Sequence, residues 1–189
     1  MNNEDFDIKI FSPIKKSAPD EPVTIADAMK RQVLSGNLQK ARELGKAIAD
    51  SYPEAAEKEE LWNIARCCEV ELDRNIKDQA IILSVFTAEY CINNYMPDPV
   101  LATTALSELY DTLTDDSPEL YSNLLSSTAF SFYYMEIDGN NADPEIIGKT
   151  FAMLCGDKNS PNLCCYGMNV FKTALENYKK AVNNTDFSE

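Results

Sequence analysis

The sequence predicts an all-α protein of about eight helices in consecutive antiparallel hairpins, forming either an irregular α-solenoid or an orthogonal bundle. Apolar residues recur every three or four positions, as they do along one face of a helix. The connections between the predicted helices are short, which favours antiparallel neighbours. A capping residue followed by proline marks four helix starts, at Asp98 with Pro99, Ser117 with Pro118, Asp143 with Pro144 and Ser160 with Pro161.

The chain begins with a segment that does not fit a helix, and residues 1–23 are predicted to form an extended N-terminal arm. Phe6, Ile8 and Ile10 alternate with charged residues, which is the period of a strand. Three prolines follow and keep the arm extended. The arm has three possible places: a helical groove of its own domain, a strand of another chain, or a flexible tail.

Residues 24–189 are predicted to form one helical domain, with helices starting near residues 24, 37, 53, 75, 98, 117, 143 and 160. Capping boxes at Thr24 with Asp27 and at Asn75 with Asp78 mark two of these starts. Residues 76–96 are apolar around most of the helix circumference. This segment is therefore the expected central helix, packed on several sides.

The first predicted hairpin, residues 25–52, resembles one unit of the tetratricopeptide family. The residues that carry the resemblance lie at its turn and second helix: Gly36, Asn37, Leu38, Gln39, Lys40, Ala41 and Ala47, with Pro53 following. The pattern is not repeated elsewhere in the chain. The resemblance implies a helical array that binds a partner; the alternative is an ordinary antiparallel turn.

Charge is the most informative feature for function, because it is unevenly distributed. The chain has 17 Lys plus Arg against 31 Asp plus Glu, a net charge of -14. No Lys or Arg lies between Lys77 and Lys149, and we call residues 78–148 the acidic block. Such a surface repels phosphate, which argues against direct binding of nucleic acid or of an anionic membrane. Its natural partner is a basic protein, a basic peptide or a cation.

Within the acidic block, carboxylates and aromatic residues suggest a surface that binds a basic partner. Four aromatic residues fall within residues 130–134, and they cannot all face one core because successive helical residues are about 100° apart. The alternative is an internal helix with tyrosine tips in water. The predicted contact residues are Glu108, Asp111, Asp115, Asp116, Tyr133 and Tyr134. We therefore expect a non-enzymatic interaction module; an inhibitor that imitates nucleic acid is a special case.

An enzyme is the alternative expectation, although the chain contains no histidine and so lacks the histidine-based catalytic triads and zinc sites. Two carboxylate pairs, Glu57 with Glu60 and Glu108 with Asp111, resemble the magnesium ligands of all-α nucleotide pyrophosphohydrolases. That resemblance implies magnesium-dependent nucleotide hydrolysis. Solvated helix faces explain the same pairs more simply, and no catalytic residue or cofactor is assigned. The loop after Asp138 is expected to be a turn and helix cap.

The six cysteines show no C-x-x-C spacing, and the N-terminal residues do not have the apolar core of a signal peptide. Both observations favour a reducing cytoplasm and buried free thiols. No apolar run is long enough to span a bilayer. The sequence leaves the oligomeric state open.

Overall fold

A computed structural model describes residues 25–52, 59–138 and 141–188, and it confirms an all-α architecture. The predicted arm over residues 1–23, including Phe6, Ile8 and Ile10, lies outside the described residues. The described helices are α1 (Ile25–Leu34), α2 (Asn37–Ala49), α3 (Glu59–Cys67), α4 (Arg74–Tyr95), α5 (Pro99–Asp116), α6 (Pro118–Ser126), α7 (Ala129–Met135), α8 (Pro144–Leu154) and α9 (Pro161–Asn184).

Three of the four predicted proline-marked helix starts carry the expected side-chain cap. The side chains of Asp98, Asp143 and Ser160 accept hydrogen bonds from backbone N–H groups in the first turns of α5, α8 and α9, at 2.7, 2.9 and 3.2 Å. Ser117 begins α6 without such a bond. Each cap satisfies an N–H group that has no partner inside the helix.

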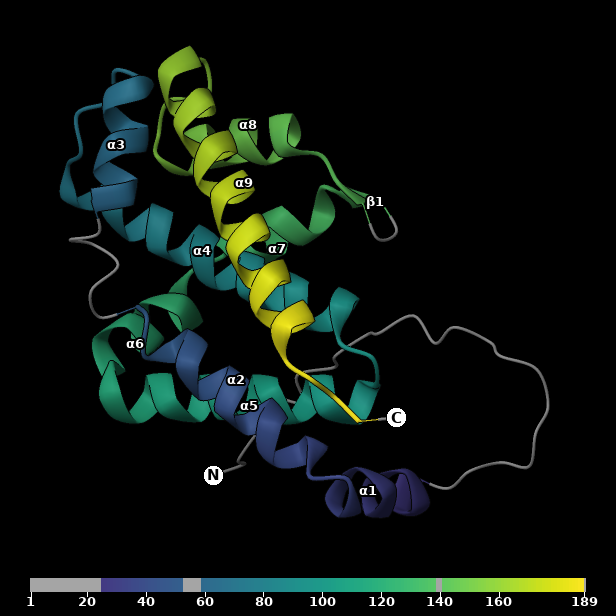
Figure 1. Cartoon of the computed structure of the whole chain (residues 1–189). Coiled ribbons are helices and arrows are strands. Elements are labelled where there is room, and N and C mark those ends of the chain that lie inside the picture. Colours follow the sequence, from purple (N-terminus) through teal and green to yellow (C-terminus); the bar gives the residue numbers. More distant parts are fainter. Residues whose placement is uncertain (1–24, 53–58, 139–140, 189) are drawn as a thin grey trace, which may run out of the picture.

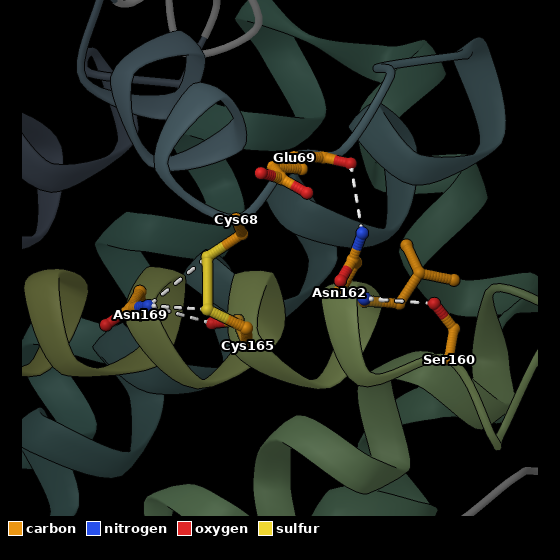
Figure 2. Close-up of a disulfide and its surroundings, with 7 residues drawn as sticks. Cys68, Glu69, Ser160, Asn162, Cys165 and Asn169 are labelled. Carbon is orange, nitrogen blue, oxygen red and sulfur yellow. Dashed lines mark hydrogen bonds between the residues drawn. A yellow bond between two sulfur atoms is a disulfide. The ribbon is translucent and has the colours of Figure 1, made fainter.

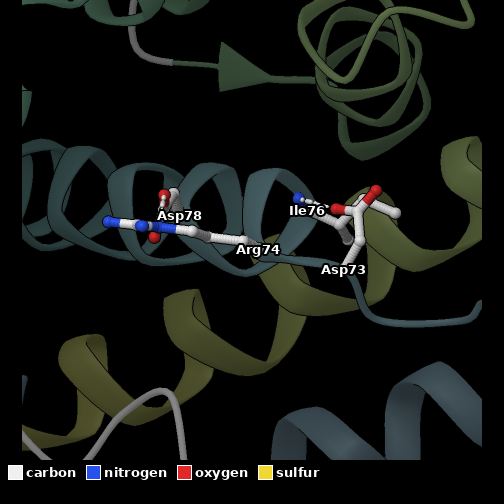
Figure 3. Close-up of polar contacts among 4 residues, drawn as sticks. All are labelled: Asp73, Arg74, Ile76 and Asp78. Atoms are coloured by element: carbon white, nitrogen blue, oxygen red, sulfur yellow. Dashed lines mark hydrogen bonds and ion pairs between the residues drawn. The ribbon is translucent and has the colours of Figure 1, made fainter.

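The cap of α4 corrects the prediction of a capping box at Asn75 and Asp78. Asp73 caps this helix, and its Oδ1 accepts from the Ile76 N–H at 2.8 Å (Figure 3). Asp78 instead lies 3.8 Å from the guanidinium of Arg74, one turn earlier. Asparagine and aspartate both cap helices well, and the structure uses Asp73, two residues before the predicted Asn75.

Two elements after residue 117 were not predicted. The single helix expected from residue 117 to about residue 134 is interrupted at Ser127, whose backbone is extended with φ -84° and ψ 134°. The Ser127 hydroxyl accepts from the Ala129 N–H at 3.1 Å, a local bond that competes with helix continuation and starts α7. A short hairpin then pairs β1 (Ile137–Asp138) with β2 (Asn141–Ala142) before the expected cap at Asp143.

The helices pack mainly against helices that are distant in the sequence. The most extensive contacts join α8 with α9, α2 with α5, and α4 with α9. Figure 1 shows α9 crossing over α4, with α2 and α5 together on one side of that pair. Among these three pairs, only α8 and α9 are consecutive in the chain. The predicted pattern of consecutive hairpins is therefore not confirmed as a general rule, and neither is a tetratricopeptide-like array. As predicted, α4 is packed on several sides, by α5, α7, α8 and α9.

Two glycines allow the closest of these helix contacts. A Cβ atom added to Gly45 of α2 would lie 2.2 Å from the backbone oxygen of Ala105 in α5. One added to Gly148 of α8 would lie 2.5 Å from the backbone oxygen of Cys164 in α9. Any larger side chain would push these backbones apart, so both interfaces depend on the missing Cβ.

A disulfide between Cys68 and Cys165 ties the end of α3 to α9, with a Cα–Cα distance of 5.8 Å (Figure 2). The Asn169 amide lies beside it and donates to the Cys165 backbone oxygen at 2.9 Å. The expectation of buried free thiols is wrong for this pair. Cys91 is a buried free thiol as expected, whereas Cys67 is free and exposed. Adjacent cysteines at residues 67–68 and 164–165 concealed which one of each pair forms the bond.

None of the described helices combines the length and the apolar character needed to cross a bilayer.

Candidate interaction surface

The carboxylates of the acidic block whose side chains the structure describes divide into two groups. Those of the first group hold the fold. Asp98 and Asp143 cap helices, and Asp98 also accepts from the Gln32 amide at 3.1 Å. Asp78 pairs with Arg74. Glu89 accepts two tyrosine hydroxyls. These four side chains are engaged within the protein.

The second group has no hydrogen bond or ion pair with any other described residue. Glu108, Asp111 and Asp115 are spaced three and four apart on α5 and therefore lie along one side of that helix. Asp116 and Glu119 continue the charge across the turn into α6. The remaining members of this group are Glu136 and Glu145. Arg74 with Asp78 is the one ion pair among the described residues, so none of these carboxylates has a described cation within ion-pair distance.

Glu89 of α4 joins three helices through its carboxylate. Its Oε2 accepts from the Tyr110 hydroxyl of α5, and its Oε1 accepts from the Tyr134 hydroxyl of α7 at 2.5 Å. Burial, and then the negative charge of Glu89, raise the pKa of both tyrosine hydroxyls, so both remain protonated donors. This arrangement fixes α7 against α4 and α5 next to the unpaired carboxylates.

The aromatic residues of α7 face opposite ways, which corrects part of the predicted contact set. Tyr133 is fully buried, with its ring centroid 5.0 Å from that of Phe86 in α4. Tyr133 is therefore a core residue and does not reach a partner. Tyr134 remains 41% exposed, although its ring edge also meets Phe86 at 5.1 Å. Phe130 completes this cluster, with its centroid 5.8 Å from that of Phe86.

Large apolar side chains are also exposed on α6 and α7, the two helices that follow α5 in the chain. Leu125 at the end of α6 is 65% exposed, and Met135 at the end of α7 is 78% exposed. Phe132 and Tyr134 are partly exposed between them along the chain. Leu125 and Met135 were absent from the predicted set. The adjacent Leu124 and Leu125 were a signal for one of them, because successive residues point about 100° apart and a helix with a single buried face exposes one of the two.

We define the α5–α7 surface by these two kinds of residue. Its carboxylates come from the second half of α5, the start of α6 and the end of α7, and its apolar side chains come from α6 and α7. The members are Glu108, Asp111, Asp115, Asp116, Glu119, Leu125, Phe132, Tyr134, Met135 and Glu136. The predicted Glu108 is half-buried against α2, whereas Asp111, Asp115 and Asp116 are exposed.

The predicted magnesium ligands do not converge in the part of the chain that the structure describes. Glu60 is exposed on α3, which packs on α9, whereas Glu108 and Asp111 lie on α5, which packs on α2. Among the described residues, no group of three acidic or cysteine side chains is placed to hold a metal ion. Glu57 lies outside the described residues. Helix packing thus places Glu60 on a different helix pair from Glu108 and Asp111.

A cleft lies between other helices, and its lining includes no residue of the α5–α7 surface. The cleft, of about 290 Å³, opens between α2, α3, α4 and α9, and most of its lining is apolar. Three of its polar residues are bonded to one another: the Ser84 hydroxyl and the Tyr178 hydroxyl lie 2.9 Å apart, and the Tyr52 hydroxyl donates to the Ser84 backbone oxygen at 3.4 Å. No Lys or Arg lines this cleft, so it offers no charge to an anionic ligand.

Comparisons with protein-family models, with curated proteins and with solved structures find no match. The chemistry of the α5–α7 surface is therefore the basis for inferring a function.

Proposed function

We propose that this chain is a non-enzymatic interaction protein that binds a basic protein or peptide through the α5–α7 surface. One observation carries the proposal: the consecutive helices α5, α6 and α7 carry carboxylates without internal partners and exposed apolar side chains, in a stretch of 71 residues without Lys or Arg. Apolar contacts at the centre of an interface supply affinity, whereas charges at its edge speed association and exclude wrong partners. The surface has both components.

Carboxylates can also serve the fold, by capping helices or accepting internal hydrogen bonds, but other carboxylates of the block do this. Helix caps and tyrosine hydroxyls occupy Asp98, Asp143 and Glu89, so the fold has drawn its structural carboxylates from elsewhere in the block. Gathering like charges along α5 costs stability through mutual repulsion. A lysine or arginine of a partner would relieve that repulsion, which gives the unpaired carboxylates a role that folding does not.

The test uses a short synthetic peptide of interleaved lysine and leucine, with a control peptide in which glutamate replaces lysine. Calorimetric titration at low and at physiological ionic strength should show binding of the lysine peptide that weakens steeply with salt, because exposed charges are screened. The glutamate peptide should not bind. Affinity that is equal at both ionic strengths contradicts the proposal.

A matched pair of variants separates this surface from total charge. E108Q/D111N/D115N/D116N removes four unpaired carboxylates from α5, and D50N/E71Q/E176Q/D186N removes four exposed carboxylates elsewhere. Each changes the net charge from -14 to -10, since four negative charges are lost. We expect the first to weaken peptide binding by about tenfold, or ~1.4 kcal/mol, and the second by less than about twofold. Equal losses of affinity in the two variants would mean that net charge, and not this surface, determines peptide binding.

A narrower form of the proposal is an inhibitor that imitates nucleic acid. The carboxylates of α5 recur every three or four residues, about 5 Å along the helix, against about 3.4 Å per phosphate of one DNA strand. This lower charge density favours an ordinary adaptor. Competition decides between them: an adaptor and DNA bind a common basic partner together, whereas an imitator displaces the DNA.

A further inference from the structure

The chain itself contains a segment with the chemistry that the α5–α7 surface requires. Residues 8–16 include three lysines, Lys9, Lys15 and Lys16, among the apolar residues Ile8, Ile10, Phe11 and Ile14. They include no Asp or Glu; the nearest acids are Asp7 before the segment and Asp20 after it. In a chain with a net charge of -14, this is a local run of positive charge. The segment lies outside the described residues.

The α5–α7 surface is complementary to this segment in both charge and polarity. Leu125 and Met135 expose 65% and 78% of their surface, and no described element covers them. Asp111, Asp115 and Asp116 are exposed and unpaired nearby in the chain. A segment that mixes lysines with isoleucine and phenylalanine would place cations on these carboxylates and apolar side chains on α6 and α7.

The chain between this segment and α1 is also long enough for the segment to reach the α5–α7 surface. Gln32 of α1 donates to Asp98, so the first helix lies at the beginning of α5, and Figure 1 shows α6 at the opposite end of α5. From Ile25 to Gln32 is about 10 Å, and from Asp98 to Asp111 is about 20 Å along α5. Fully extended, the nine residue steps from Lys16 to Ile25 can span about 30 Å, and the sixteen steps from Lys9 can span about 53 Å.

We propose that residues 8–16 dock on the α5–α7 surface of the same chain and compete there with an external basic partner. The inference rests on the proposed function, because it names the first ligand of the same surface. An external peptide must then displace the internal one. The internal segment acts at an effective concentration in the millimolar range, as expected for a short tether. Removing its lysines should therefore tighten external binding roughly three- to tenfold.

Zero-length carbodiimide cross-linking of the full chain tests the docking directly. We expect amide cross-links from Lys9, Lys15 or Lys16 to carboxylates of α5–α7, within single chains, as shown by mass spectrometry of mixed light and heavy isotope-labelled copies. The E108Q/D111N/D115N/D116N variant should lose most of them. Cross-links only to acids outside this surface, cross-links only between copies, or none from these lysines would each overturn the proposal.

Competition with the lysine–leucine peptide provides the second measurement. The variant K9Q/K15Q/K16Q should bind the peptide roughly three- to tenfold more tightly than the native chain. The control K158Q/K172Q/K180Q makes the same change of net charge, from -14 to -17, at exposed lysines of the other side, and should gain much less. Equal affinity of the native chain and K9Q/K15Q/K16Q overturns internal competition while leaving the proposed function intact. If the peptide binds none of the three chains, the proposed function fails, and the cross-linking result alone decides the docking.

Discussion

The two sides of α4 differ in how fully their side chains are engaged within the protein. On one side α9 covers α4, its Phe171 is fully buried, and a disulfide ties it to the end of α3. On the other side α5, α6 and α7 leave carboxylates unpaired and Leu125 and Met135 exposed. The α9 side also has lysines on its surface, whereas the acidic block has none. We expect from this difference that stability is concentrated around α9, and the proposed binding role falls to the α5–α7 surface.

Truncation of one large apolar side chain on each side should show the largest contrast. Phe171→Ala removes a fully buried ring from the α9 side and should lower the free energy of unfolding by about 3–5 kcal/mol. Met135→Ala removes a side chain that is 78% exposed and should change it by less than about 0.5 kcal/mol. Urea unfolding measures both, and peptide binding should weaken only for Met135→Ala. Similar destabilisation by the two variants would remove the contrast.

Reduction of the disulfide should have the next largest effect, and only on stability. Cys68 and Cys165 are 97 residues apart in the sequence, and breaking such a link costs about 2–4 kcal/mol in unfolding free energy. The affinity for the lysine–leucine peptide should stay within about twofold, since the bond lies on the α9 side. Urea unfolding with and without a reductant measures the effect.

Two variants control for the reductant itself. Cys67→Ser keeps the disulfide and should remain sensitive to reductant, whereas the double variant C68S/C165S should be insensitive. A native chain whose unfolding is unchanged by reductant would contradict a stabilising role for this bond.

Glu89 should affect both stability and peptide binding, because its carboxylate joins α4 to α5 and α7. Glu89→Ala leaves the hydroxyls of Tyr110 and Tyr134 without their carboxylate and should cost about 2 kcal/mol of unfolding free energy. Peptide binding should weaken as well, since α7 loses a contact with α4. Glu145→Ala is the matched control: an exposed acid of the same block, without a hydrogen bond from its side chain, expected to cost less than about 0.5 kcal/mol. If Glu145→Ala proved as costly, the two tyrosine bonds would not explain the effect.

Sequence reasoning succeeded where the physics is local. Asp98, Asp143 and Ser160 were predicted as helix caps and are caps, because a cap needs only its own side chain and the next two or three N–H groups. The uneven charge of residues 78–148 likewise required only reading the chain. The break at Ser127 escaped because its apolar neighbours continue a helical pattern on both sides.

The rest depends on contacts between distant segments. Tyr133 and Tyr134 are adjacent and chemically identical, and both rings meet Phe86, yet the packing of α7 buries the first and leaves the second 41% exposed. The packing of α2 on α5, and the choice of Cys68 and Cys165 from two adjacent pairs, are equally non-local. The division of the acids into engaged and unpaired groups follows from that packing, so it could not be predicted from the sequence.

Chemical-shift mapping of the lysine–leucine peptide on the ¹⁵N-labelled full chain tests the central claim most directly. Binding at the α5–α7 surface predicts that amide shifts concentrate between residues 108 and 136, around Asp111, Asp115, Leu125 and Met135, and spare α8 and α9. Shifts concentrated on α9, or around the cleft beside Tyr52 and Tyr178, would contradict it.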